Sequence, residues 1–157
     1  MQYKIDAFKI QDWFDIDPRD EVAADLESIR QDVPFFKEIY TGGAPFFTLR
    51  YGDEIIMIYG FLYSGNGSYH PSLIPSKNIS KHKKIAVKLI HEYFATYVPR
   101  TCRRLETYCD IMDTKAIRLA KHFGFDIIGI RHSASANGHD QAIMERLTFV
   151  DPRKVQR

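Results

Sequence analysis

Apolar residues recur along the chain at two spacings, which predict helices and strands. Between residues 85 and 98 they recur every three or four positions, in rows such as Ile85, Leu89 and Tyr93. That spacing is typical of a helix that packs on a sheet. Residues 54–63 are almost continuously apolar instead, and a strand of that kind is expected to be covered on both faces. The two patterns together predict a central sheet with helices on either side.

Turn and capping residues divide the N-terminal half. Residues 4–14 mix apolar and polar positions and predict a first strand. Asp17-Pro18 then predicts the start of a helix, because aspartate caps helices and proline suits the first helical position, and Pro34 is expected to end it. Thr41-Gly42-Gly43 predicts a turn. Tyr51-Gly52-Asp53 predicts a hairpin between strands at 45–50 and 54–63.

The C-terminal half continues the alternation. Strands are predicted at 68–74 and 105–109, on either side of the long helix. Asp113 is expected to cap a further helix that ends at Gly124, a residue suited to a left-handed conformation. Strands at 125–130 and 141–149 follow, with the loop 133–140 between them. At 157 residues the chain is expected to form one domain, residues 1–157.

Composition narrows the function classes. The 22 Lys and Arg residues against 20 Asp and Glu give a net charge of +2, too small to favour general nucleic-acid binding. Cys102 and Cys109 lie seven positions apart around a predicted strand, which puts them on opposite faces and argues against a disulfide. Reduced thiols and an N-terminus without an apolar signal core predict a cytoplasmic protein, and no apolar run reaches membrane-spanning length.

A basic run, Ser80-Lys81-His82-Lys83-Lys84, stands immediately before the long helix. Positive side chains there oppose the helix dipole, at a cost of roughly 0.3–1 kcal/mol each. Free backbone N–H groups at a helix start favour phosphate, and lysines would strengthen that preference. The run therefore predicts an anion site, and the alternative is that the lysines extend into water.

The segment Asp113-x-x-Ala116-x-x-Leu119-Ala120-x-x-x-Gly124-Phe125, with the element order around it, resembles the GNAT superfamily of N-acetyltransferases. The usual segment in that family reads Asn-x-x-Ala-x-x-Leu-Tyr-x-Lys-x-Gly-Phe. The resemblance implies an α/β (α+β) fold: a mixed, mostly antiparallel central sheet of six to seven strands with helices on both faces. It covers most of the chain.

The resemblance also implies acetyl-coenzyme A as cosubstrate. Counted from Pro75, the family's pyrophosphate motif falls on Asn78, Lys81 and Lys83, so lysines stand where glycines are usual. A glycine lets the backbone approach a phosphate closely, whereas a lysine adds both bulk and charge. The cofactor-binding residues implied are Leu73, Ile74, Ile79, Ser80, Lys81, His82, Lys83, Lys84 and Asp113. For Asp113, capping its helix is an equally good interpretation.

Catalytic candidates lie on the strand at 105–109. The family's tyrosine acid is replaced by Ala120, so Tyr108 is the substitute we consider, against a packing role. A base must take the proton of an ammonium before the amine attacks, and Glu106 is the first candidate, ahead of Glu54 and His70. Cys109 is interpreted as a small core residue. The cysteines and histidines show no metal-ligand spacing, so no metal is predicted.

Three functions compete at this stage. The first is transfer of acetyl from acetyl-coenzyme A to an amine of a small molecule or a protein, by direct attack on the thioester. The second is a catalytically inactive binding or structural protein, similar to acetyltransferase-like proteins of bacteriophages. The third is local nucleic-acid binding through Lys81, Lys83, Lys84 and Lys88, which the small net charge opposes. Whether the protein forms a homodimer is left open by the sequence.

Overall fold

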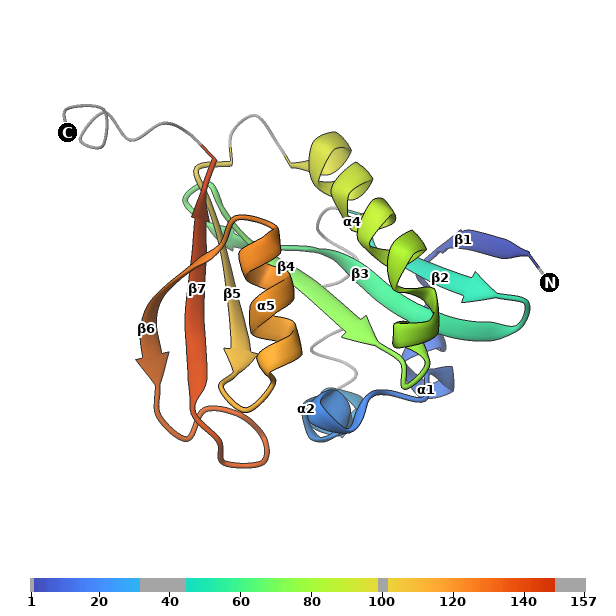
Figure 1. The fold of residues 1–157 in the computed structure, drawn as a ribbon, viewed down its shortest axis with the longest axis horizontal. Helices are drawn as coiled ribbons and strands as arrows, with labels where there is room; N and C mark the ends of the chain where they lie inside the picture. The colour runs from blue at the N-terminus through green and yellow to red at the C-terminus, as the bar shows by residue number, and fades with distance from the viewer. Residues whose placement is uncertain (1, 32–44, 99–101, 149–157) are drawn as a thin grey trace. The chain divides into compact units, whose positions relative to one another are not determined.

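The computed structural model describes residues 2–31, 45–98 and 102–148 (Figure 1). Its strands are β1 (Tyr3–Ala7), β2 (Phe47–Tyr51), β3 (Glu54–Gly65), β4 (Ser68–Pro75), β5 (Arg104–Asp110), β6 (Asp126–Arg131) and β7 (Gln141–Leu147). Its helices are α1 (Asp12–Asp15), α2 (Asp20–Gln31), α4 (Lys83–Tyr97) and α5 (Thr114–His122), with a 3-10 turn η1 (Ile79–His82). None of the helices in these described ranges is long and apolar enough to cross a membrane.

The seven strands form one sheet in the order β1-β2-β3-β4-β5-β7-β6. β4 and β5 run parallel, whereas β1–β2, β2–β3, β5–β7 and β6–β7 are antiparallel. The predicted mixed, mostly antiparallel sheet is therefore confirmed, as is the hairpin at Gly52-Asp53. The predicted turn at Thr41-Gly42-Gly43 lies outside the described residues, as does the Phe149 end of the last strand.

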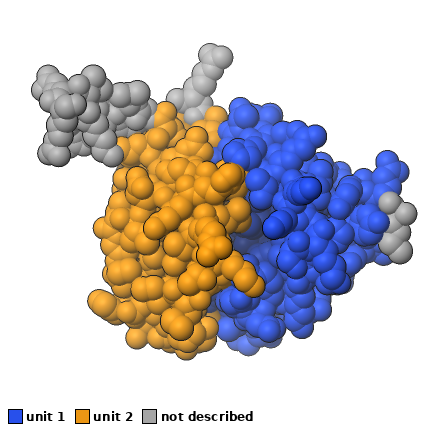
Figure 2. Space-filling model, viewed as in Figure 1, with its two compact units in different colours: residues 1–62, 72–97 blue, residues 63–71, 98–157 orange. Residues whose placement is uncertain are grey.

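Contacts along the chain divide it into two compact units (Figure 2), which we describe one at a time. Unit 1 comprises residues 1–62 and 72–97, and unit 2 comprises residues 63–71 and 98–157. Each unit holds several strands of the sheet and at least one helix. The single domain expected from the chain length stays a prediction.

In unit 1, β3 is covered on both faces, as its apolar sequence predicts. On one face, the rings of Tyr59 and Phe61 lie 5.3 and 4.8 Å from the ring of Tyr93 on α4. On the other face, Ile58 belongs to a buried cluster with Trp13 and residues of α2. Burial of these apolar side chains is the main force that holds the two helices to the strand.

The N-terminal segment departs from its prediction. The strand expected over 4–14 ends at Ala7, and α1 follows, with Trp13 completely buried. The helix expected from Asp17-Pro18 begins at Asp20, because Pro18 instead bridges to Ser76. Long-range contacts of Asp12 and Trp13 thus replace the local alternation on which the strand prediction rested.

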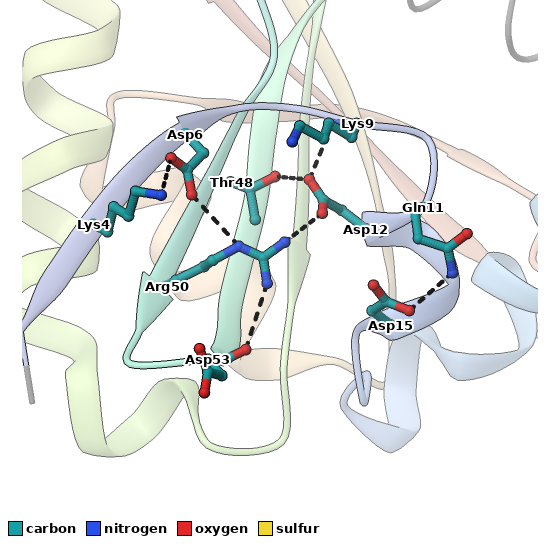
Figure 3. Close-up of polar contacts among 9 residues, drawn as sticks. All are labelled: Lys4, Asp6, Lys9, Gln11, Asp12, Asp15, Thr48, Arg50 and Asp53. Atoms are coloured by element: carbon teal, nitrogen blue, oxygen red, sulfur yellow. Dashed lines mark hydrogen bonds and ion pairs between the residues drawn. The ribbon is translucent and has the colours of Figure 1, made fainter.

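Asp12 explains why the chain turns at α1. Its carboxylate, 2% exposed, accepts hydrogen bonds from the Thr48 hydroxyl at 2.6 Å and from the Lys9 N–H at 3.0 Å, and it pairs with Arg50 Nη2 at 2.5 Å (Figure 3). Arg50 also lies 3.6 Å from Asp6 on β1. A buried carboxylate needs such partners, since an unpaired one is strongly disfavoured.

In unit 2, α5 contacts β5 (Figure 1). Asp113 caps the helix by accepting a hydrogen bond from the Ala116 N–H at 3.0 Å, and Gly124 follows the helix with φ +84°. Both the cap and the left-handed glycine were predicted. β6 begins at Asp126, one residue later than expected.

Candidate functional site

Alternate residues of β5 present polar side chains on one face of the sheet in unit 2. Leu105 and Cys109 are buried, whereas Arg104, Glu106 and Tyr108 are half-buried or exposed. The strand period of two places these three side chains on the same face. Glu106 pairs across the ladder with Glu145 of β7. We call this surface the β5 polar face: Arg104, Glu106, Tyr108, Glu145, His70 and Arg131.

Glu106 and Tyr108, the two catalytic candidates from the sequence, are hydrogen-bonded to each other. The Tyr108 hydroxyl donates to Glu106 Oε1 at 2.6 Å. This bond to a carboxylate, with some burial, raises the pKa of Tyr108 above its usual value, although Arg131 and Arg104 oppose the shift. The hydroxyl therefore keeps its proton at neutral pH and can act as a proton donor.

His70, the sequence's alternative base, lies against the same tyrosine. Its ring centroid is 5.4 Å from that of Tyr108, with 30° between the planes. Burial lowers the pKa of His70, and its interactions with the Glu106 backbone and charge only partly offset that effect. The imidazole is thus neutral at pH 7 and can accept a proton. The parallel pairing of β4 with β5 through Ser68–Arg104 and Tyr69–Leu105 explains the proximity.

Arginines surround the pair, and sequence reasoning missed both of them. Arg104 Nη2 lies 3.2 Å from Glu106 Oε2, and Arg104 Nη1 lies 3.3 Å from Glu145 Oε2. Arg131 of β6 lies over the Tyr108 ring, with Cζ 4.5 Å from the centroid. The period of two on β5 could have indicated Arg104. Arg131 has no such signal, because its contact depends on the strand order.

The basic run belongs to unit 1 and has a different local structure from the one expected. Lys81 and His82 lie in η1, and Lys83 and Lys84 are the first residues of α4. The Lys81 N–H donates to the Asn78 carbonyl at 2.9 Å, so this amide is already occupied. The side chains of Lys81, Lys83 and Lys84 are exposed. The anion site expected here therefore depends more on lysine charge than on free backbone donors.

Side-chain contacts of His82 and Asn78 hold this turn. His82 Nδ1 lies 2.8 Å from the Tyr3 hydroxyl, and the His82 ring is 5.1 Å from that of Tyr51. The Asn78 side chain donates to Glu54 Oε1 at 2.6 Å. Glu54, the second alternative base, is thus a partner of this turn and lies outside the unit that contains the β5 polar face.

The other cofactor-binding candidates are in mixed surroundings. Ile74 is 7% exposed and packs in the core cluster of unit 1, whereas Leu73 and Ile79 are half-buried and Ser80 is exposed. Asp113, 4% exposed, accepts the hydrogen bond that caps α5. Ile74 and Asp113 therefore have a structural role each, whatever else they contact.

Cys109 matches its interpretation as a core residue. Both cysteines are unpaired and buried. Burial, together with the charge of Asp113, raises the pKa of the Cys109 thiol to about 11, which suppresses the nucleophilic thiolate. In the ranges described, no three histidine, cysteine or carboxylate side chains gather in a group that could hold a metal ion.

Comparisons by sequence and by structure give different results. No protein-family model matches the sequence, and no curated protein matches it either. Solved structures do match along nearly the whole chain. Ard1 from Thermoplasma volcanium is similar with a TM-score of 0.71 at 10% identity, over 94% of this chain and 99% of the other.

Two further structures extend the likeness. An IAA acetyltransferase from Bacillus cereus is similar with a TM-score of 0.67 at 15% identity, over 93% of this chain and 99% of the other. Spermidine N-acetyltransferase from Vibrio cholerae, solved in complex with CoA and spermine, is similar with a TM-score of 0.64 at 14% identity. The similarity covers 93% of this chain and 95% of the other. Such identities establish the fold alone. The chain has the mixed seven-stranded fold of the GNAT acetyltransferases.

Proposed function

We propose that the protein is an acetyl-coenzyme A-dependent N-acetyltransferase that transfers acetyl to an amine. The observation that carries the proposal is the hydrogen bond between Tyr108 and Glu106, with His70 against the same ring. A protonated phenol, a carboxylate and a neutral imidazole thereby lie within one small area of the β5 polar face. Amine acetylation needs such groups, because it removes one proton and delivers another.

The proton transfers that amine acetylation requires give each residue its proposed role. Glu106 takes a proton from the ammonium, directly or through a water, and the neutral amine attacks the thioester carbon. The C–N bond forms, the C–S bond breaks, and Tyr108 gives its proton to the departing thiolate. Arg104, paired with both Glu106 and Glu145, holds the carboxylate of Glu106 in place. His70 is the reserve acceptor for the same proton.

Coenzyme binding is proposed for the basic run and its neighbours. The side chains of Lys81, Lys83 and Lys84 would contact the pyrophosphate, with Ser80, His82, Ile79, Leu73 and Ile74 beside it. A neighbour with this fold, the Vibrio cholerae spermidine N-acetyltransferase, was solved with CoA bound. The proposal includes a cytoplasmic location, where Cys102 and Cys109 stay reduced.

Activity can be tested by following thiol release from acetyl-coenzyme A with a panel of amines. Tyr108→Phe and Glu106→Gln are each expected to lower kcat by roughly 100- to 10,000-fold, the usual range for a lost general acid or base. Tyr63→Phe is the matched control, because Tyr63 is an exposed tyrosine of β3 whose ring contacts only the ring of Tyr69 among the ring contacts described. Full activity in both catalytic variants would remove these residues from the mechanism.

Coenzyme binding is tested separately by calorimetric titration. Replacing Lys81, Lys83 and Lys84 together with alanine is expected to weaken binding by roughly 5- to 150-fold, if each lysine contributes about 0.3–1 kcal/mol. Replacing Lys115 and Lys121 of α5 serves as the control. Unchanged affinity in the triple variant would place the pyrophosphate elsewhere.

The second candidate function is a binding or structural protein without catalysis, of the bacteriophage type. It is favoured by the occupied Lys81 amide and by Ala120 at the position of the usual acid. The same titration separates the two. No binding and no thermal stabilisation at millimolar acetyl-coenzyme A would favour this candidate.

A further inference from the structure

Arg131 is held across the sheet by an aromatic ring. It lies on β6 and Tyr108 lies on β5, with β7 between them, so the arginine side chain crosses β7 to reach the ring at 4.5 Å. A guanidinium stacked in this way is attracted by the ring quadrupole. Its N–H donors stay in the guanidinium plane and remain available for a carboxylate.

The charged residues near Arg131 already form ion pairs. Arg104 pairs with Glu106 and Glu145. Asp110, near Arg131 by register, pairs with His139 at 2.9 Å and accepts the Met112 N–H at 2.8 Å. Among the residues that the structure describes, Arg131 has no carboxylate partner. It therefore offers an exposed, oriented cation beside the catalytic pair.

We propose that the acceptor is an amine that also carries a carboxylate, with Arg131 as the residue that binds the carboxylate. Glu106 contacts Tyr108 at its hydroxyl and Arg131 contacts it on its ring face. An amino acid with a few bonds between its charged groups can place its ammonium at Glu106 and its carboxylate at Arg131. This inference rests on the proposed function and narrows its substrate class.

The experiment compares pairs of acceptors in which a carboxylate is replaced by a neutral amide. Glycine, β-alanine and 4-aminobutanoate are measured against glycinamide, β-alaninamide and 4-aminobutanamide in the thiol-release assay. We expect the best carboxylate to exceed its amide by about 10- to 100-fold in kcat/KM, the usual effect of a hydrogen bond to a charged group. Arg131→Gln should abolish this preference, because it lowers kcat/KM for the carboxylate far more than for the matched amide.

Two variants complete the design. Arg131→Lys is expected to restore part of the preference, because it keeps the charge without the planar fork. Arg118→Gln on α5 should behave like the wild type, since Arg118 is an exposed arginine of the same unit on the helix. A merely structural Arg131 would instead lower turnover of carboxylate and amide alike in Arg131→Gln.

The outcomes separate this inference from the proposed function. Acetylation of amines without any preference for carboxylates supports the transferase and overturns the role of Arg131. If no amine is acetylated, calorimetric titration of the amino acids still decides, because tighter binding of carboxylates than of amides that is lost in Arg131→Gln supports the site. Equal binding of the two series overturns it.

Discussion

Replacing Asp12 with alanine should destabilise the protein strongly. The substitution removes a carboxylate that is 2% exposed and leaves the Thr48 hydroxyl, itself fully buried, without its acceptor. Losing one member of a buried ion pair costs about 3–5 kcal/mol. Arg50 is 22% exposed in its side chain and keeps Asp6 as a second partner. We therefore expect the lower end of that range, about 3 kcal/mol, for Asp12→Ala.

Urea denaturation measures this loss directly. Trp13 is the single tryptophan of the chain and adjoins Asp12, so its fluorescence reports on the region. A loss of about 3 kcal/mol corresponds to a fall in Tm of roughly 6–12 °C for a protein of this size. Asp15→Ala, on the same helix but exposed, should change stability by no more than about 0.5 kcal/mol.

Two further variants distinguish the charge from the hydrogen bond. Asp12→Asn keeps an oxygen that can accept a hydrogen bond from Thr48. The fall in its free energy of unfolding should therefore lie between that of Asp15→Ala and that of Asp12→Ala. Asp12→Ala combined with Arg50→Met removes both charges and should be less damaging than the two single effects added together. A loss below about 1 kcal/mol for Asp12→Ala would refute the assignment of a buried, stabilising ion pair at this position.

Three more predictions follow from local features. Because its pKa is raised to about 11, Cys109 should react with iodoacetamide at pH 8 roughly 100-fold more slowly than an unperturbed thiol; alkylation at the ordinary rate would contradict its burial. Gly124→Ala should cost about 1–2 kcal/mol in chemical denaturation, since φ is +84° there, and an unchanged midpoint would be inconsistent with a left-handed helix end. Burial alone would raise the pKa of Asp110, but hydrogen bonds from Met112, His139 and Asn137 outweigh it and lower that pKa. The stabilisation this carboxylate gives the loop should therefore be complete above its ordinary pKa of 3.8 and be lost only as pH falls through the lowered value. Amide hydrogen exchange of residues 133–140 against pH measures it, with Asp110→Asn as reference.

Local signals in the sequence predicted the parts of the fold that depend on neighbouring residues. The continuous apolar run of β3, the helical rows of α4 and the Asp113 to Gly124 helix needed only spacing and capping rules. The strand prediction for residues 4–14 was wrong for a physical reason: α1 has four residues, too few to show a helical period. Its position depends on Asp12 and Arg50, which are far apart in sequence.

In the candidate site too, local sequence patterns predicted some of the neighbouring residues and strand pairing determines the others. Glu106 and Tyr108 share a face because a strand has a period of two, so their proximity followed from sequence. His70 reaches them only through the parallel pairing of β4 with β5, and Arg131 only through the order β5-β7-β6. Neither arrangement leaves a pattern in nearby residues. The sequence also could not show that η1 occupies the Lys81 amide.

The contact between His82 and Tyr3 has a thermodynamic consequence for any ligand of the basic run. The turn is already held in place without a ligand. His82 forms a hydrogen bond of 2.8 Å with Tyr3 on β1, and its ring contacts the ring of Tyr51 on β2. A preorganised loop loses little conformational entropy when it binds, so little of the binding enthalpy is offset by ordering. Removing these contacts with His82→Ala should make the entropy of ligand binding less favourable in calorimetry. The binding enthalpy from the lysine contacts should be largely kept.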